Sequence, residues 1–391
     1  MEQISSESRT ALLPLLRIVN GTRSRTMSTK ALGTLCSRQQ HFIKFLHIIK
    51  LGNNVALKGF TLTVRNIIMA CYTAHLVSGQ NLLCMSIKSG TVSRYLVAAS
   101  ELSLPAKMMN PCLDIMGKQS TYIKDILNES KRWEAIPNRK EPVTKQMIEY
   151  IIQKGKDLQK NNSDNIYSAL SDWLVLGQQT GFRRKEWAQD RTLLKKDKDI
   201  QRNIDNSSSA FIMEDFEFRI NAHKRINNSS TKEVNKASVV NIKWRYQKNL
   251  DNGQVLSYVK DTEDKQHCAL EACKKIRKRA IKLKIAKDKP IAVYTEYKKG
   301  NKQTCYIDDI HIKTILQEAA KQVYGIKCKK ELARFSSHSI RVGACVLLHA
   351  QNISAEDIKF RLRWRSDSFR MYLRNIIQLA ERHKDAIRNA T

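Results

Sequence analysis

A short polar stretch with two prolines, residues 133–142, constrains the fold of this sequence more than any other feature. Pro137 and Pro142 lie in it, and proline disfavours helix both at its own position and at the residue before it. A chain of 391 residues also exceeds the usual size of one domain. We therefore predict a linker at 133–142 between a first domain at 33–132 and a second at 143–391.

The part of the chain before this linker shows helical spacing and no strand pattern. Residues 1–32 are rich in Ser, Thr and Arg with weak periodicity, so we expect a mobile N-terminal arm there. From residue 33, apolar side chains recur at the spacing of one helix face. They form three runs: Leu35, Phe42, Phe45, Leu46 and Ile49; Ile67, Ile68, Ala70, Cys71 and Leu76; and Val92, Tyr95, Leu96, Ala99 and Leu102. This pattern predicts an all-α domain at 33–132.

Beyond the linker the pattern is mixed. Helical spacing covers 143–158, 165–179, 266–284 and 309–324, and the third of these helices should face inward through Leu270, Cys273, Ile276, Ala280 and Ile281. Three short strands are predicted at 211–218 and on both sides of the turn residues Asp251-Asn252-Gly253, within 239–260. The polar segment 190–208 is too long for a compact loop and is interpreted as a surface insertion. The predicted fold class is mainly α with a small antiparallel β-sheet.

The charge of the chain indicates its partner. Lys and Arg number 69 against 37 Asp and Glu, which gives a formal net charge of +32. Such a surface is broadly electropositive and favours a polyanion. Because 42% of the residues are hydrophobic, the chain has enough apolar content to fold and is not a disordered basic tail.

Several common cofactor and compartment signals are missing from the sequence. The nine cysteines are scattered without a C-x-x-C pair, which predicts reduced thiols in an intracellular protein. His267, Cys268 and Cys273 fit no common zinc spacing, so core packing is favoured over metal ligation. No P-loop pattern, no two-metal carboxylate cluster, no signal peptide and no apolar run of about 18 residues is visible. We expect no cofactor, no metal and no membrane association.

Four short motifs follow one another in the second domain. They are Thr180-Gly181-Phe182-Arg183-Arg184-Lys185-Glu186; Gln247-Lys248-Asn249 at the end of the first hairpin strand; Ser337-His338-Ser339-Ile340-Arg341 at the start of an apolar helix; and Leu362-Arg363-Trp364, followed by Tyr372. In order and spacing they resemble the active-site motifs of the tyrosine recombinases. The Arg363-Trp364 form resembles the eukaryotic Crypton and DIRS mobile-element branch most closely.

The resemblance implies a site that binds and cleaves a phosphodiester without a metal. Arg183 and Arg341 would bind the two non-bridging oxygens, because a guanidinium is a planar, permanently charged, bidentate donor. Arg184 lies beside the motif position and is the nearest competitor of Arg183. Glu186 would hold a catalytic Arg or His in place without contacting the DNA itself. Trp364 would donate its indole N–H to a phosphate oxygen or support the pocket.

The resemblance also implies the nucleophile and the proton carriers. Tyr372 would attack phosphorus to form a 3′-phosphotyrosyl enzyme, and the two arginines and His338 would favour its ionisation. His338 lies one helical turn before the second arginine, on the same face. It would donate to a phosphate oxygen or exchange a proton with the nucleophile. Lys248 would protonate the leaving 5′-oxygen, with Lys243 and Lys260 as alternatives. Taken singly, each residue also has an ordinary interpretation as a surface cation, a helix-start histidine or a core aromatic.

The family further implies an all-α core-binding domain at 33–132 and an α+β catalytic domain at 143–391 that close around double-stranded DNA. The expected protein is a site-specific recombinase or integrase of a mobile element, acting as a homo-tetramer on paired DNA sites. A type IB topoisomerase is one alternative, although it usually carries S-K-x-x-Y where this chain has Ser368-Phe369-Arg370-Met371-Tyr372. A non-catalytic, domesticated DNA-binding protein is the other.

Two further segments carry expectations. The basic run 274–279 predicts nuclear localisation in a eukaryotic host, and a cytoplasmic protein otherwise. A DNA-facing or solvated helix face is the other interpretation of that run. Residues 375–391 predict a short amphipathic helix that docks either on a neighbouring protomer or on its own catalytic domain.

Overall fold

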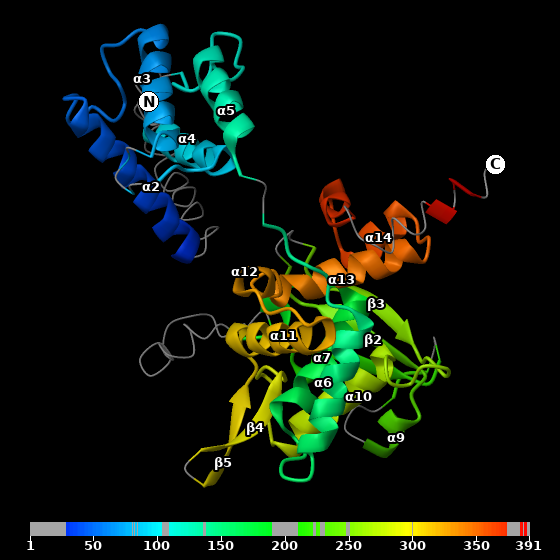
Figure 1. The fold of residues 1–391 in the computed structure, drawn as a ribbon. Helices are drawn as coiled ribbons and strands as arrows, with labels where there is room; N and C mark the ends of the chain where they lie inside the picture. The colour runs from blue at the N-terminus through cyan, green and yellow to red at the C-terminus, as the bar shows by residue number, and fades with distance from the viewer. Residues whose placement is uncertain are drawn as a thin grey trace. The chain divides into compact units, whose positions relative to one another are not determined.

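The computed structural model describes residues 29–391 apart from 80, 82, 84, 104–108, 136–137, 190–209, 222–223, 227–230, 248–250, 299, 374–383, 386 and 389–391. The chain divides into two compact units, Met1–Pro137 and Asn138–Thr391, and the division falls inside the stretch predicted as a linker. Figure 1 shows a helical first unit and a second unit in which helices accompany short strands. The fold is mainly α with small antiparallel sheets, as the sequence predicts.

The first unit contains only helices among its described elements: α2 (Thr29–Ile48), α3 (Leu62–Val77), α4 (Ser89–Ser103) and α5 (Thr121–Trp133). α2 begins inside the stretch predicted as a mobile arm, and residues 1–28 of that arm lie outside the described part. α2 packs on α4 and α3 packs on α5. The core of this unit includes Phe42, Phe45, Leu46, Tyr72, Leu76, Val92 and Leu96. Ile49, Ile67 and Cys71, predicted to share the apolar face, are exposed instead.

The second unit is built around α7 (Ile166–Thr180), which is buried along nearly its whole length. Asn165 caps its start by accepting a hydrogen bond from the Ser168 N–H. α6, α10, α11 and α13 all contact it. These helices are α6 (Lys145–Leu158), α10 (Ala269–Lys282), α11 (Asp309–Tyr324) and α13 (Ser337–Ala350), and shorter ones are α9 (Thr231–Asn235), α12 (Lys329–Leu332) and α14 (Ala355–Leu362). Buried residues lie on every face of α7, which places this helix at the centre of the unit.

A three-stranded antiparallel sheet lies beside these helices, in the order β1-β2-β3. Its strands are β1 (Phe216–Arg219), β2 (Val239–Trp244) and β3 (Gln254–Val259), and the register pairs Phe216 with Ile242 and Ile242 with Leu256. Alternate side chains of β2 and β3 point into the core, where α10 contacts both strands. The three predicted strands are therefore present, although the first covers Phe216–Arg219 instead of 211–218, because Met213–Asp215 form a 3₁₀ turn. The predicted insertion at 190–208 lies outside the described residues.

A second hairpin was not predicted. β4 (Val293–Lys298) and β5 (Asn301–Tyr306) pair antiparallel, from Val293 with Tyr306 to Lys298 with Asn301. Gly300 in the turn has φ +79°, a conformation that favours glycine. β5 is polar and mostly exposed, so its sequence lacks the alternation of apolar and polar residues that identifies a strand.

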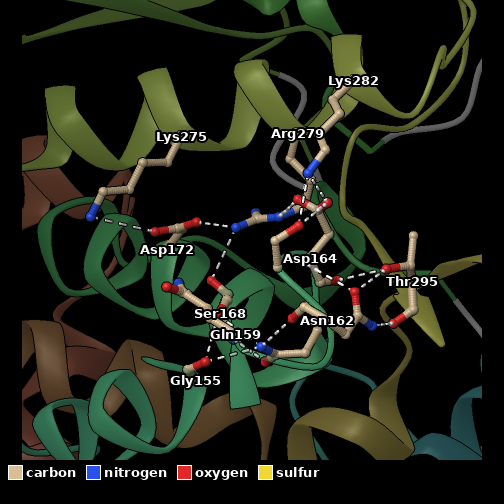
Figure 2. A network of polar contacts seen from close by, with 12 residues as sticks. Gly155, Gln159, Asn162, Asp164, Ser168, Asp172, Lys275, Arg279, Lys282 and Thr295 are labelled. Atoms are coloured by element: carbon tan, nitrogen blue, oxygen red, sulfur yellow. Dashed lines mark hydrogen bonds and ion pairs between the residues drawn. The ribbon is translucent and has the colours of Figure 1, made fainter. Parts of the chain in front are cut away.

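A network of ion pairs around two buried carboxylates joins α10 to α7 and to the residues just before α7 (Figure 2). The Arg279 Nη2 donates to Asp172 Oδ2 at 2.6 Å and to the Ser168 carbonyl at 3.2 Å. Lys282 donates to Asp164 Oδ2 at 2.6 Å. Lys275 lies 3.9 Å from the other Asp172 oxygen. The predicted basic helix is thus fastened to α7 by its charges as well as by its apolar face.

These contacts change the interpretation of two sequence features. Within the basic run 274–279, Arg277 and Arg279 are buried, so the run is not a uniformly solvated helix face. Burial also lowers the pKa of Arg277. Ile281, predicted to face the core, is 41% exposed and lies beyond the packed face.

Candidate active site

The end of α7 delivers the first motif. Gly181 ends the helix in the left-handed conformation, φ 52°, and a Cβ at this position would lie 2.6 Å from Leu362 Cδ2. Glycine is therefore required twice, for the backbone and for the packing. Directly after it, the Glu186 carboxylate accepts hydrogen bonds from the Arg183 backbone N–H at 2.9 Å and from Arg183 Nη1 at 3.1 Å. Glu186 is buried, so it fixes Arg183 at the start of the 3₁₀ turn η2 (Arg184–Glu186).

The start of α13 carries the third motif. The Ser339 Oγ accepts a hydrogen bond from the Ser336 N–H at 3.0 Å, which fixes the first turn of the helix. Arg341 is buried and donates through Nη1 to the Gly181 carbonyl at 2.5 Å. This bond joins the start of α13 to the end of α7, so the two predicted phosphate-binding arginines come from adjacent segments.

An extended strap, residues 139–143, lies against the start of α13. The Val143 N–H donates to the Ser339 carbonyl at 3.0 Å, and the Glu141 N–H donates to the Arg334 carbonyl at 3.2 Å. Gly343 allows this approach, because a Cβ there would lie 2.4 Å from the Val143 carbonyl oxygen. The end of the predicted linker is thus bound to the second unit rather than free.

The predicted nucleophile lies beside the predicted histidine. Tyr372 ends the 3₁₀ segment η4 (Asp367–Tyr372), and its hydroxyl is 2.9 Å from His338 Nε2. The Trp364 ring packs against Tyr372 with the ring centroids 5.4 Å apart, and the Arg341 guanidinium carbon lies 4.4 Å from the centroid of Trp364. The indole N–H of Trp364 is buried without a hydrogen-bond partner in the described residues. An acceptor such as a phosphate oxygen would satisfy it.

The charges at the site favour an anion. Burial, together with the positive charge of Arg183, lowers the pKa of Arg341. Partial burial, together with the charges of Arg341 and Lys140, lowers the pKa of His338, so its imidazole is neutral near pH 7. The positive charges of Arg183, Arg341 and Lys140 act on one another and on His338 at this site, and a bound phosphate relieves their repulsion.

The two arginines act on Tyr372 in the predicted direction, but burial acts against them. Burial raises the pKa of its hydroxyl, and although Arg341, Arg139 and Arg183 act in the opposite direction, they do not overcome it. The cationic neighbours are present as predicted, but the sequence could not show that the phenol is half-buried. In the protein without DNA, Tyr372 is therefore a neutral phenol hydrogen-bonded to His338.

The predicted general acid cannot be placed. Lys248 lies outside the described residues, in the connection between β2 and β3. The two alternatives, Lys243 on β2 and Lys260 after β3, are both exposed. The structure thus brings together Arg183, Glu186, His338, Arg341, Trp364 and Tyr372, and leaves the position of the lysine as a prediction.

One residue of the site was missed. Arg363 follows α14 in the left-handed conformation, φ 57°, and its side chain is wholly buried. It donates through Nη2 to Glu186 Oε2 at 3.2 Å, and its guanidinium carbon lies 3.9 Å from the centroid of the Trp244 ring. The sequence signal is an arginine directly after a helix, where glycine is the usual residue.

The described residues contain no group of three His, Cys, Asp or Glu side chains placed to hold a metal ion. His267 is instead hydrogen-bonded to Asp264, and Cys268 and Cys273 lie in the core. All described cysteines are free thiols. Within the same residues, no helix is long and apolar enough to cross a membrane.

A scan against models of known protein families and a search of curated protein sequences both find no match. Solved structures give distant likenesses. The Tn1549 transposon integrase in complex with transposon right end DNA is 12% identical over 90% of this chain and 99% of that chain, with a TM-score of 0.41. The same integrase in complex with circular intermediate DNA is 13% identical over 86% and 94%, with a TM-score of 0.37. At such scores the residues of the site, not these likenesses, carry the functional inference.

Proposed function

We propose that this protein is a DNA tyrosine recombinase that breaks and rejoins strands through Tyr372. The observation that carries the proposal is the hydrogen bond between Tyr372 and His338, beside the stacked pair Arg341 and Trp364. A tyrosine hydroxyl, a neutral proton acceptor and a permanently charged guanidinium are the groups that a metal-independent attack on a phosphodiester needs.

In the proposed reaction, DNA first places a phosphodiester between Arg183 and Arg341, which bind its non-bridging oxygens. The Tyr372 hydroxyl passes its proton to His338 Nε2, 2.9 Å away, as its oxygen attacks phosphorus. A bond forms between the tyrosine oxygen and phosphorus while the bond from phosphorus to the 5′-oxygen breaks. Lys248, as the proposed general acid, protonates that 5′-oxygen. Rejoining is the reverse, with a 5′-hydroxyl as the nucleophile.

The finer parts of the proposal follow from the motifs. We infer action on paired double-stranded DNA sites as a homo-tetramer, for a mobile element of the Crypton or DIRS type, in the nucleus of a eukaryotic host. The net charge of +32 supports the choice of DNA. A type IB topoisomerase would use the same site chemistry, so strand exchange between two duplexes distinguishes the two enzymes. A domesticated binding protein would bind DNA and form no covalent adduct.

The test is to trap the covalent intermediate on a library of nicked duplexes and to sequence the attached DNA. Wild-type protein should give a protease-resistant tyrosyl–DNA adduct, and Tyr372→Phe should give none while binding DNA with unchanged affinity. Tyr297→Phe is the matched control, because Tyr297 is an exposed tyrosine on β4 that should not affect the adduct. An adduct formed by Tyr372→Phe would refute the nucleophile, and no adduct with any duplex would favour the binding protein.

A further inference from the structure

Arg363 occupies a backbone conformation that is costly for any residue with a side chain. It has φ 57° and ψ 54°, and its N–H donates to the Phe360 carbonyl at 3.2 Å. Helices commonly end in this conformation with glycine, because a Cβ clashes there. An arginine is kept in such a position only when its contacts outweigh the strain.

The side chain of Arg363 joins three parts of the second unit. Its Nη2 donates to Glu186 Oε2 at 3.2 Å and lies 3.5 Å from the Thr180 carbonyl oxygen, at the end of α7. Its guanidinium lies over the ring of Trp244, the last residue of β2. The residue after it is Trp364, which contacts both Arg341 and Tyr372. Arg363 therefore fixes both the carboxylate behind Arg183 and the point at which the chain turns toward Trp364.

The charge of Arg363 matters as much as its shape. Glu186 is shared, since Oε1 accepts from Arg183 and Oε2 accepts from Arg363. Arg183, Arg341 and Arg363 surround the single carboxylate of Glu186, so these four residues together carry three positive charges and one negative charge. This surplus of two positive charges faces the negative charge that the phosphodiester oxygens gain as Tyr372 attacks. Without Arg363, Glu186 would be free to neutralise Arg183 alone.

We propose that Arg363 is a positioning residue of the cleavage site, which holds Glu186 so that Arg183 keeps its charge and its outer N–H groups for the scissile phosphate. The inference rests on the proposed function. Arg363 is wholly buried, so it does not touch the DNA itself. It acts in two ways: it holds the Glu186 carboxylate in place, and its positive charge attracts the scissile phosphate.

The experiment measures two quantities separately: the affinity for duplex DNA, and the single-turnover rate of adduct formation at saturating DNA. Arg363→Met should leave affinity within a few-fold and slow the adduct step by about 10²–10³-fold, the loss typical of one removed transition-state donor. Arg363→Lys restores the charge without the planar fork and should give an intermediate rate. Arg363→Gly suits the left-handed backbone and serves if the Met variant folds poorly.

The matched control is Arg361→Met. Arg361 lies on the same helix and also stacks on an aromatic ring, with its guanidinium carbon 4.0 Å from the centroid of Tyr258, but it makes no contact with Glu186. Its removal should not change the single-turnover rate. In a Glu186→Gln background, the further loss from Arg363→Met should shrink, because the two residues act as one unit.

The outcomes distinguish a failure of the positioning role of Arg363 from a failure of the proposed function. If wild-type protein forms an adduct and folded Arg363→Met and Arg363→Gly form it at the same rate, the positioning role is refuted while the proposed function stands. A loss confined to DNA affinity would refute it as well, because a buried positioning residue acts after binding. If wild-type protein forms no adduct with any duplex, the proposed function fails and the role of Arg363 fails with it.

Discussion

Removing Arg279 should destabilise the second unit through the charge that it leaves behind. In the wild-type protein, the Asp172 carboxylate is buried and accepts a hydrogen bond of 2.6 Å from Arg279. Arg279→Met keeps a long apolar side chain on α10 but removes this partner. Asp172 would then be a buried carboxylate whose nearest cation is Lys275, 3.9 Å away and about half exposed.

The size of the effect follows from this geometry. Removing one partner of a buried ion pair lowers the free energy of unfolding by about 3–5 kcal/mol, because the remaining charge stays desolvated. Lys275 can move closer and compensate in part, so we expect about 3 kcal/mol. With a urea dependence of about 1–3 kcal/mol per molar, the midpoint of unfolding should fall by about 1–3 M.

The destabilisation should also depend on pH, in a direction set by the pKa of Asp172. Burial raises the pKa of Asp172 above its unfolded value, so its ionised form opposes folding at neutral pH. That opposition is lost as the pH falls through the folded pKa. Loss of Arg279 raises this pKa further, so the destabilisation should be larger near pH 8 than near pH 5. The pKa of Asp164 is lowered by Lys282 and Arg279, so Asp164 works in the opposite direction. It stabilises the folded protein at pH values above its unfolded pKa, and this stabilisation is lost as the pH falls through its lowered folded pKa.

Urea unfolding followed by tryptophan fluorescence is the suitable assay. Trp173, Trp187 and Trp244 are buried in the second unit, whereas Trp133, in the first unit, is 81% exposed and changes little on unfolding. Arg277→Met is the matched control on the same helix, because Arg277 is buried and forms no ion pair within the described part of the chain. That substitution should be neutral or slightly stabilising. A second substitution, Asp172→Asn, should recover part of the loss in Arg279→Met. An equal loss in the control, or a loss that does not change between pH 5 and pH 8, would contradict the reasoning.

Three other predictions concern the site and its partner. Gly343→Ala should destabilise the second unit by about 1–3 kcal/mol and expose Arg139 to trypsin, because its Cβ meets the Val143 carbonyl at 2.4 Å. Gly90→Ala on α4 has open space and should not destabilise. The rate of adduct formation should fall only below about pH 6.5, since the reaction needs neutral His338 and burial lowers its pKa; a rate that already falls above pH 7 would argue against His338 as proton acceptor. DNA affinity should fall by roughly 10³–10⁵-fold between about 50 and 200 mM salt, as for a protein with 6–10 phosphate contacts, and a weak dependence measured by fluorescence anisotropy would contradict an encircling clamp.

Local signals made much of the fold predictable. The helix predicted at 309–324 is α11, with the same bounds, because its apolar spacing is regular and its ends are marked by an aspartate cap and by Gly325. α7 ends where Gly181 indicates. The hairpin at 239–260 is present because alternation and turn residues occur together. In each case, the information lies within the element itself.

What the sequence could not show depends on contacts between distant segments. The β4–β5 hairpin has little apolar alternation, so its pairing is stabilised by main-chain hydrogen bonds that leave no pattern. Arg279 and Arg277 look like solvated charges until α7 is placed against α10. The burial that raises the pKa of Tyr372 and the hydrogen bond between Arg363 and Glu186 join residues far apart in the chain. Periodicity does not record such contacts.

The strap at 139–143 also has a mechanical meaning. The chain enters the second unit at Asn138 and is first held at Arg139, whose carbonyl accepts from Arg334 Nε at 3.1 Å, and at Lys140, whose Nζ donates to the Ala333 carbonyl at 2.7 Å. The main-chain hydrogen bonds to Arg334 and Ser339 follow, on either side of His338 in the sequence. Each such bond has a net worth of about 0.5–1.5 kcal/mol, so a modest pull can open the strap one bond at a time. Any tension carried along the backbone through Asn138 therefore reaches residues 333–339, the segment that leads into the first turn of α13, before the rest of the unit. His338, the histidine next to the nucleophile, belongs to this segment, so a force on the linker would act on the backbone that carries it.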